Sequence, residues 1–284
     1  MVMAALKYYA RHPGQVVQAL RDPLGFSARL SNRLDALVED RLVLRRRPIY
    51  SICEDWQDRL HAAAGHTGEC QETDSFEQLW RVISARLSAQ GYRIGPESYF
   101  GWNDGDLGLA RAIWCLVRHT RPAHVVETGV GHGITTRFIL EALDRNGSGR
   151  LWSIDLPPVD PAVAAQVGAA VDGDCTKRWT LLRGTSRQLL PKLLRQLGRI
   201  DLFIHDSLHT ARNVKFEINQ ARRALQPSGF IVVDDIDLNS AFAESVRELP
   251  KQRWLACEAR PVVPDYRRFN HKGLFGLILP ATLH

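Results

Sequence analysis

The chain has 284 residues, of which 45% are apolar and 24% charged, and its formal net charge is +6 at pH 7. This length accommodates a full α/β core plus an appendage, and the composition is that of an ordinary globular protein. No apolar run approaches the roughly 20 residues that span a bilayer, and Lys7 interrupts the start of the chain where a signal peptide would be apolar. We therefore expect no membrane span and a cytoplasmic location.

The five cysteines are scattered, odd in number and show no C-x-x-C spacing. This pattern argues against a disulfide framework and against a structural zinc site. We expect free thiols that are mostly buried.

The N-terminal region carries most of the charge. Residues 1–50 contain nine basic and four acidic residues, which is +5 of the total of +6. Apolar residues recur there at helical spacing, with breaks at residues 12–14 and 22–25. We interpret residues 1–50 as a basic helical arm, through which a homo-oligomer could form. The run Arg45-Arg46-Arg47 could contact nucleic acid, anionic lipid or an acidic partner, or it is a solvated helix end.

A second helical region is predicted over residues 51–100, as a cap or lid. Residues 76–87 have helical spacing, and the polar residues 65–73 predict a loop. The pattern changes near residue 101, and residues 101–284 are predicted to form the catalytic domain, beginning with a helix over 106–117.

Short apolar strands alternate with helices through this third region. The predicted strands are 124–128, 151–155, 179–183, 201–206, 229–234 and 273–279. Strands that alternate with helices indicate right-handed βαβ units. The sequence therefore predicts an α/β fold of Rossmann-like type, with a mostly parallel sheet covered by helices on both faces.

The most informative stretch lies where the first of these strands meets its helix. Glu127 is followed by three glycines at alternate positions, Gly129, Gly131 and Gly133. Such a turn lets backbone approach a ligand and directs free helix N–H groups at it. A dinucleotide fingerprint would need a small residue at position 134, which is Ile134. The carboxylate of Glu127 would repel a pyrophosphate but suits a cationic ligand such as S-adenosylmethionine.

Two later positions support a nucleoside-like ligand. Asp155 ends the next strand, where a carboxylate can accept both hydroxyls of a ribose. An NAD-binding fold places an acid similarly, so Asp155 alone does not decide the ligand. After the third strand, Ser186 could bring its hydroxyl to an adenine edge, although such turns are common.

Acidic residues also end the two following strands. Asp206 closes one strand, and Asp234 and Asp235 close the other. If the strands are neighbours about 4.8 Å apart, these carboxylates could converge on one hard cation such as Mg²⁺. The alternative is that they cap the helices that follow.

His209 follows Asp206 by three residues. A histidine at the edge of a site can take a proton from a substrate hydroxyl, and the alternative is a surface histidine in the first turn of a helix. His205 precedes Asp206 in the strand and is expected to point to the opposite side, into packing.

Together these residues resemble the class I S-adenosylmethionine-dependent methyltransferases. More narrowly, they are similar to the branch that contains catechol-type and macrolide-sugar O-methyltransferases and cephalosporin-hydroxylase-like proteins. The resemblance covers roughly residues 95–280. The motifs that carry it are Glu127-Thr128-Gly129-Val130-Gly131-His132-Gly133, Asp155, Gly184-Thr185-Ser186, His205-Asp206-Ser207-Leu208-His209 and Asp234-Asp235.

The resemblance implies a seven-stranded sheet and a role for each matched position. The residues expected at the cofactor are Glu127, Gly129, Gly131, Gly133, Thr135, Asp155, Ser186 and Asp206. Of these, Thr135 would lie near the methionine carboxylate, Asp155 at the ribose and Ser186 by the adenine. The expected ligands of a divalent cation are Asp206, Asp234 and Asp235. His209 stands where catechol-type relatives carry a lysine base, so we expect it to act with Asp206 in catalysis.

The expected function is methyl transfer from S-adenosylmethionine to a small-molecule or sugar hydroxyl, assisted by Mg²⁺ or a similar cation. One alternative is a metal-independent nucleic-acid methyltransferase that uses the basic arm on phosphates. The near-neutral charge of the remaining chain and the lack of an Asn-Pro-Pro-Tyr-type motif argue against nucleic acid. A further alternative is a non-catalytic scaffold that retains the cofactor pocket.

Overall fold

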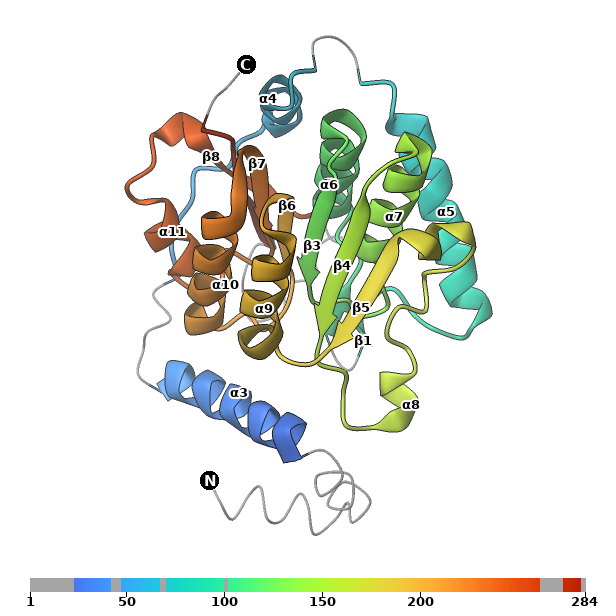
Figure 1. Cartoon of the computed structure of the whole chain (residues 1–284), viewed down its shortest axis with the longest axis vertical. Helices are drawn as coiled ribbons and strands as arrows, with labels where there is room; N and C mark the ends of the chain where they lie inside the picture. The colour runs from blue at the N-terminus through green and yellow to red at the C-terminus, as the bar shows by residue number, and fades with distance from the viewer. Residues whose placement is uncertain (1–22, 42–46, 67–69, 100–101, 261–272, 282–284) are drawn as a thin grey trace.

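The computed structural model describes residues 23–41, 47–66, 70–99, 102–260 and 273–281. Its centre is a seven-stranded sheet of order β5-β4-β3-β6-β7-β9-β8 (Figure 1). The strands are β1 Gly95–Tyr99, β2 Trp102–Asp104, β3 His124–Thr128, β4 Arg150–Asp155, β5 Trp179–Arg183, β6 Ile200–His205, β7 Leu225–Val233, β8 Trp254–Glu258 and β9 Leu274–Ile278. The first five strands of the sheet order run parallel, and β9 runs antiparallel to both β7 and β8.

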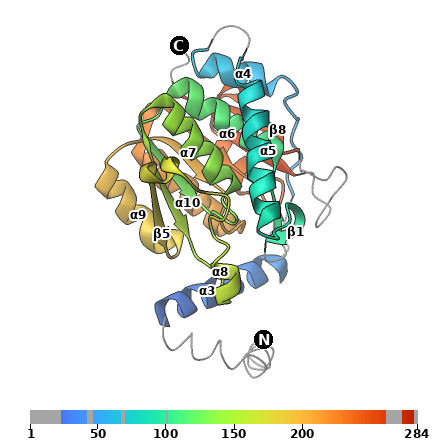
Figure 2. The same ribbon diagram turned by 90° about the vertical axis from the view of Figure 1, so that its right-hand side faces the viewer.

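Helices cover both faces of this sheet (Figures 1 and 2). They are α3 Pro23–Arg41, α4 Trp56–Ala63, α5 Thr73–Ala89, α6 Leu107–Thr120, α7 Ile134–Asn146, α8 Pro161–Ala164, α9 Ser186–Leu197, α10 Ala211–Ala224 and α11 Ala241–Val246, with short 3₁₀ turns at Asp174–Arg178 and Lys251–Arg253. In β3, Val125 packs with the core of α4 to α7, whereas Val126 packs with that of α9 to α11. Because successive side chains of a strand point to opposite faces, a strand that is covered on both sides carries apolar residues toward each face.

The strand order reverses direction beside β3. The chain passes from β3 through α7 to β4 on one side, while β6 pairs with β3 on the other. In open parallel sheets, ligands bind beyond the carboxyl ends of the strands at such a switch point. The predicted glycine turn and the strand-end acids all follow strands at this carboxyl edge.

Helix α3 lies across the same edge (Figures 1 and 2). Glu39 accepts hydrogen bonds from the backbone N–H groups of Ala211 and Arg212 at the start of α10, at 2.8 and 3.0 Å. Asp35 forms ion pairs with Arg187 and Arg212 at 3.2 and 3.0 Å. The described part of the predicted basic arm therefore makes these contacts with α9 and α10 through acidic residues. Its apolar residues Leu30, Leu34, Leu37 and Val38 are exposed.

The predicted Rossmann-like fold, with seven strands and helices on both faces, is confirmed. The helices expected over 76–87 and 106–117 are present as α5 and α6. The sequence did not predict the edge strand β8 or the antiparallel pair of β1 and β2. Residues 1–22 and Arg45 and Arg46 lie outside the described residues. Within the described residues, no helix is both long and apolar enough to cross a membrane.

Candidate active site at the carboxyl edge of the sheet

The glycine turn between β3 and α7 has a left-handed backbone. Gly129, Gly131 and Gly133 have φ values of +86°, +54° and +82°, a region that side chains other than hydrogen rarely enter. A Cβ atom on Gly129 would lie 1.8 Å from the backbone oxygen of Asp206. The turn therefore packs directly against the residue that follows β6, and only glycine fits at position 129.

Glu127 is buried beneath this turn. Its Oε2 atom accepts hydrogen bonds from the Thr136 hydroxyl at 2.8 Å and the Ser153 hydroxyl at 2.6 Å. Burial raises the pKa of Glu127 to about 7, and nearby Asp155 adds to the rise, although the two hydroxyl hydrogen bonds oppose it. Glu127 thus links β3, β4 and α7 in this structure, and its contact with a cofactor stays a prediction.

Asp155 ends β4 beside the same turn. Its Oδ2 atom accepts a hydrogen bond from the backbone N–H of Val130 at 2.9 Å. Burial raises the pKa of Asp155, while hydrogen bonds from the N–H groups of Val130 and Gly131 lower it. The half-buried Thr135 lies in the first turn of α7, which has no side-chain cap. The N–H groups of that turn can therefore receive an anionic group.

The strand-end acids meet on the other side of the turn. Strands β6 and β7 pair in parallel with His205 opposite Val233, so Asp206 and Asp234 follow adjacent strands at the same level. Atoms of Asp206, His209 and Asp234 that can bind a metal lie within 4.8 Å of one another. His209 Nε2 lies 3.7 Å from Asp206 Oδ1 and 4.0 Å from Asp235 Oδ2.

The alternative role of these acids as helix caps is not what the structure shows. The residue at the N-cap of α10 is Thr210, whose side chain accepts from the Asn213 N–H, and the residue at the N-cap of α11 is Ser240. Asp235 instead has a left-handed backbone with φ of +51°. A non-glycine residue in that region costs free energy and often occurs at functional sites.

Asp234 has the most unusual electrostatic environment of this group. It is 8% exposed, and its Oδ1 atom has no hydrogen-bond partner among the described residues. Burial raises the pKa of Asp234 well above its usual value, and the charges of Asp235, Asp206 and Asp106 raise it further. Asp106, which precedes α6, was not predicted at this site, because it lies a hundred residues away from the other acids in the sequence.

A buried polar network lies behind the acids and was also missed. Glu217 of α10 is fully buried, and its carboxylate contacts His205 Nδ1 at 2.6 Å, the Thr128 hydroxyl at 2.5 Å and the Ser207 hydroxyl at 2.8 Å. Burial alone would raise the pKa of Glu217, but the charge of His205 and its hydrogen bonds lower it to about 2. His205 therefore points into the interior, as expected, but toward a carboxylate. The sequence signal was a glutamate on the apolar face of a helix, beside Val214 and Ile218.

Ser186 borders this network. It begins α9 and is buried, and its hydroxyl lies 3.4 Å from Asn213 Oδ1. Its predicted contact with adenine stays a prediction. In contrast, the structure brings the glycine turn together with Asp155 and Asp206, and it brings Asp206, His209 and Asp234 into one group.

The comparison with protein families matches the region that holds this site. A family model described as a methyltransferase domain matches residues 126–236. Residues 126–236 are therefore similar to a methyltransferase domain. The matched residues begin in β3 and end just after the acids that follow β7, so the domain includes both halves of the site. A search of curated proteins returns no match.

Several solved structures are similar to this chain in chain arrangement. A putative O-methyltransferase from Klebsiella pneumoniae has 20% sequence identity and a TM-score of 0.48, over 72% of this chain and 90% of that one. TomG, an O-methyltransferase from Streptomyces achromogenes involved in tomaymycin synthesis, has 14% identity and a TM-score of 0.45, over 81% and 100%. An O-methyltransferase from Bacillus cereus in complex with SAH has 15% identity and a TM-score of 0.45, over 72% and 90%.

Proposed function

We propose that this chain transfers the methyl group of S-adenosylmethionine to a hydroxyl oxygen of a small-molecule or sugar acceptor, with a divalent cation such as Mg²⁺. One observation carries this proposal. The glycine turn contacts the backbone of Asp206, and Asp206 forms one group with His209 and Asp234. A cofactor on the turn and an acceptor at the acids would therefore lie next to each other.

The residues around the turn fit S-adenosylmethionine. The cofactor carries a reactive methyl group on a cationic sulfonium. Asp155, already oriented by the Val130 N–H, can accept ribose hydroxyls, and the uncapped start of α7 with Thr135 can receive the methionine carboxylate. The carboxyl groups of Glu127 and Asp155 suit a cationic ligand better than a pyrophosphate. Ser186 would border the adenine.

The strand-end acids fit a hard divalent cation. Several carboxylates converge, and the buried Oδ1 atom of Asp234 has no partner among the described residues; a cation would relieve both the repulsion and the unmet hydrogen bonding. We assign Asp206, Asp234 and Asp235 as its ligands, since carboxylate oxygens are what Mg²⁺ prefers. Bound there, the cation would orient the acceptor and lower the pKa of its hydroxyl.

His209 would accept the acceptor proton. Its Nε2 atom faces the carboxylates of Asp206 and Asp235 within 4.0 Å, which stabilise an imidazolium once it forms. Asn239 Nδ2 donates to the His209 backbone oxygen at 3.0 Å and fixes that residue. Orienting the acceptor oxygen toward the methyl group supplies much of the acceleration in a displacement of this kind.

Two measurements test the proposal. Isothermal titration calorimetry of the full chain with S-adenosylmethionine should show binding, and a panel of phenol and sugar hydroxyl acceptors should yield S-adenosylhomocysteine only when a divalent cation is present. No heat of binding by folded protein would refute the cofactor assignment. Binding without turnover on any acceptor would favour the scaffold alternative, and full turnover in chelator would refute the cation.

A further inference from the structure

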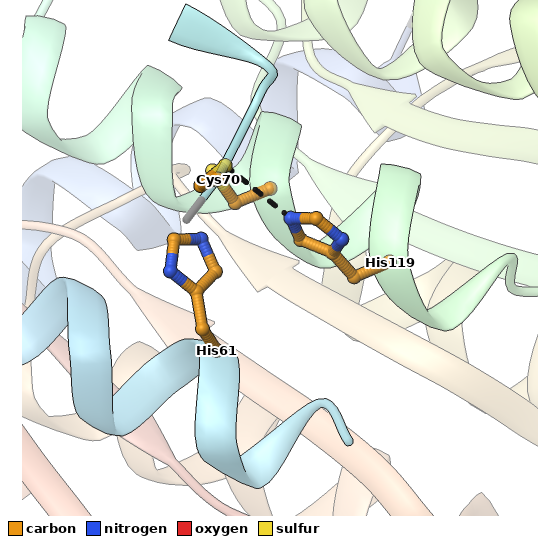
Figure 3. Close-up of side chains that lie close together, drawn as sticks. His61, Cys70 and His119 are labelled. Carbon is orange, nitrogen blue, oxygen red and sulfur yellow. Dashed lines mark hydrogen bonds between the residues drawn. The ribbon is translucent and has the colours of Figure 1, made fainter. Parts of the chain in front are cut away.

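A second cluster of potential metal ligands lies at the opposite edge of the sheet. It comprises His61 of α4, Cys70, and Cys115 and His119 of α6. Figure 3 shows His61, Cys70 and His119. Helix α6 ends at Thr120 and β3 begins at His124, so the cluster lies near the amino end of β3. The proposed active site follows the carboxyl ends of the strands, and the two are therefore separate.

The positions of the four residues explain how they converge. Cys115 and His119 are four residues apart on α6, which places both on one side of that helix. Helix α4 packs on α6 and contributes His61, and Cys70 lies in the segment between α4 and α5. In Figure 3, the rings of His61 and His119 approach Cys70 from two different helices.

The distances match a tetrahedral metal site. The sulfur atoms of Cys70 and Cys115 are 3.9 Å apart, and Cys70 Sγ lies 3.4 Å from His119 Nε2. Around a tetrahedral zinc ion with Zn–S of about 2.3 Å and Zn–N of about 2.0–2.1 Å, sulfur atoms are about 3.8 Å apart and sulfur and nitrogen about 3.5 Å. One ligand atom from each of the four residues lies within 4.8 Å of all the others. A disulfide would need the sulfur atoms at about 2.05 Å.

The surroundings of the cluster favour the binding of a cation by these side chains. His61 is 7% exposed, and its Nε2 atom has no hydrogen-bond partner in the described part of the chain. Arg111 Nη2 lies 3.6 Å from Cys70 Sγ, a contact that stabilises a thiolate. His119 also lines a pocket with Ala63 and Ala64.

We propose that His61, Cys70, Cys115 and His119 bind one zinc ion in a Cys₂His₂ site. Four protein ligands leave no open position, which is typical of structural zinc. The ion would join α4 and the segment that contains Cys70 to α6, whose Ile113 and Trp114 are buried in the core that α6 shares with the sheet. The site would thus attach the N-terminal helices to the methyltransferase domain without taking part in catalysis.

Metal analysis of the full chain, purified under reducing conditions without chelator, tests this site. We expect about one zinc ion per chain, and cobalt in its place should give the near-ultraviolet charge-transfer absorption of thiolate ligands. Cys115→Ser should lose both signals. Cys53→Ser is the matched control, because Cys53 is half-buried and hydrogen-bonds Asp55 outside the cluster, and it should retain both. Asp206→Ala should also retain the zinc.

A second measurement needs no variant, in case Cys115→Ser does not fold. Zinc should protect two thiols of the wild-type chain from alkylation, and mass spectrometry should locate them at Cys70 and Cys115. Failure to bind zinc or cobalt, retention of zinc by folded Cys115→Ser, or protection of Cys70 and Cys115 that does not depend on zinc would overturn the proposal. So would a disulfide between Cys70 and Cys115 in the protein as isolated.

Discussion

The two edges of the sheet hold clusters of different chemistry. At the carboxyl edge, the potential ligands are carboxylates and one imidazole, on loops that follow adjacent strands. At the amino edge they are two thiols and two imidazoles, on helices and the segment between them. Oxygen ligands suit Mg²⁺, and sulfur and nitrogen ligands suit zinc. Position and ligand type thus both separate the proposed active site from the proposed zinc site.

Asp206→Ala is the strongest test of this separation. Removing a carboxylate that we assign to the cation should lower turnover by about 10³-fold, because the acceptor is no longer positioned. Steady-state kinetics with Mg²⁺ measures the effect at the carboxyl edge, and zinc analysis of the same variant measures any effect at the amino edge. The exposed Asp174→Asn serves as the control and should keep full activity. Wild-type rates in Asp206→Ala, with and without chelator, would remove the proposed mechanism.

Glu217→Gln tests whether the buried network supports the carboxyl edge. The lowered pKa of Glu217, about 2 against a usual 4.5, means that its ionised form stabilises the fold. That contribution is complete above pH 4.5 and is lost as the pH falls toward 2. At pH 7 the variant should be less stable by roughly 3 kcal/mol, and its loss of stability in acid should be shallower than in the wild type. Urea unfolding from pH 7 down to pH 3 measures both, and parallel curves for the two proteins would contradict the prediction.

Glu127 should make the stability of the wild type depend on pH in the opposite sense, and Glu127→Gln should remove that dependence. The pKa of Glu127 is raised from 4.5 to about 7, so the folded protein holds this proton more tightly than the unfolded chain. The wild type should therefore lose stability as the pH rises from 4.5 to 7, by an amount on the order of 3 kcal/mol. The amide cannot ionise, and the variant should lack this loss. An unchanged slope of unfolding free energy against pH would show that Glu127 is not the buried acid responsible.

The sequence predicted the carboxyl edge because parallel topology converts sequence order into spatial position. Each predicted strand ends at one edge, so residues such as Asp155, Asp206 and Asp234, which close strands, had to approach one another. The same logic predicted the sheet from its apolar runs. The prediction from apolar runs missed β8, the short run from Trp254 to Glu258. This strand follows a small helix and a 3₁₀ turn, so it does not belong to a regular βαβ unit.

The same rule gives no information about groups on helices. Glu217 reaches His205 only because α10 packs on β6, and Asp106 reaches Asp234 only because the start of α6 lies by the end of β7. The cysteines show the limit most clearly, since their spacing argued against zinc. Cys115 and His119 are adjacent on a helix, but Cys70 and His61 come from more than forty residues earlier. Only the packing of α4 and α6 brings them together.

His209→Ala tests the division of roles within the carboxyl edge. If His209 is the base, turnover should fall by about 10²-fold while the affinity for Mg²⁺ is retained. Its acidic limb in the pH–rate profile should also disappear, because that limb reports protonation of the base. Metal titration followed by kinetics separates the two quantities. A large loss of Mg²⁺ affinity would instead make His209 a ligand beside Asp206 and Asp234, which their mutual distances of under 4.8 Å also allow.

The smallest expected effect concerns helix α3 at the carboxyl edge. Glu39→Ala removes the acceptor of two N–H groups at the start of α10, and the loss of such a cap costs about 1 kcal/mol. Exchange of the Ala211 and Arg212 amide hydrogens should therefore become about fivefold faster, whereas Glu39→Gln keeps an oxygen acceptor and should show less change.

Helix α3 also contacts the segment after Asp155, because Arg29 donates to the Pro157 oxygen at 2.8 Å. Looser docking of α3 should therefore raise the KM for S-adenosylmethionine. Zinc content should stay the same, since the ligands lie at the other edge of the sheet, and equal exchange in all three proteins would mean that Glu39 does not hold α3 in solution.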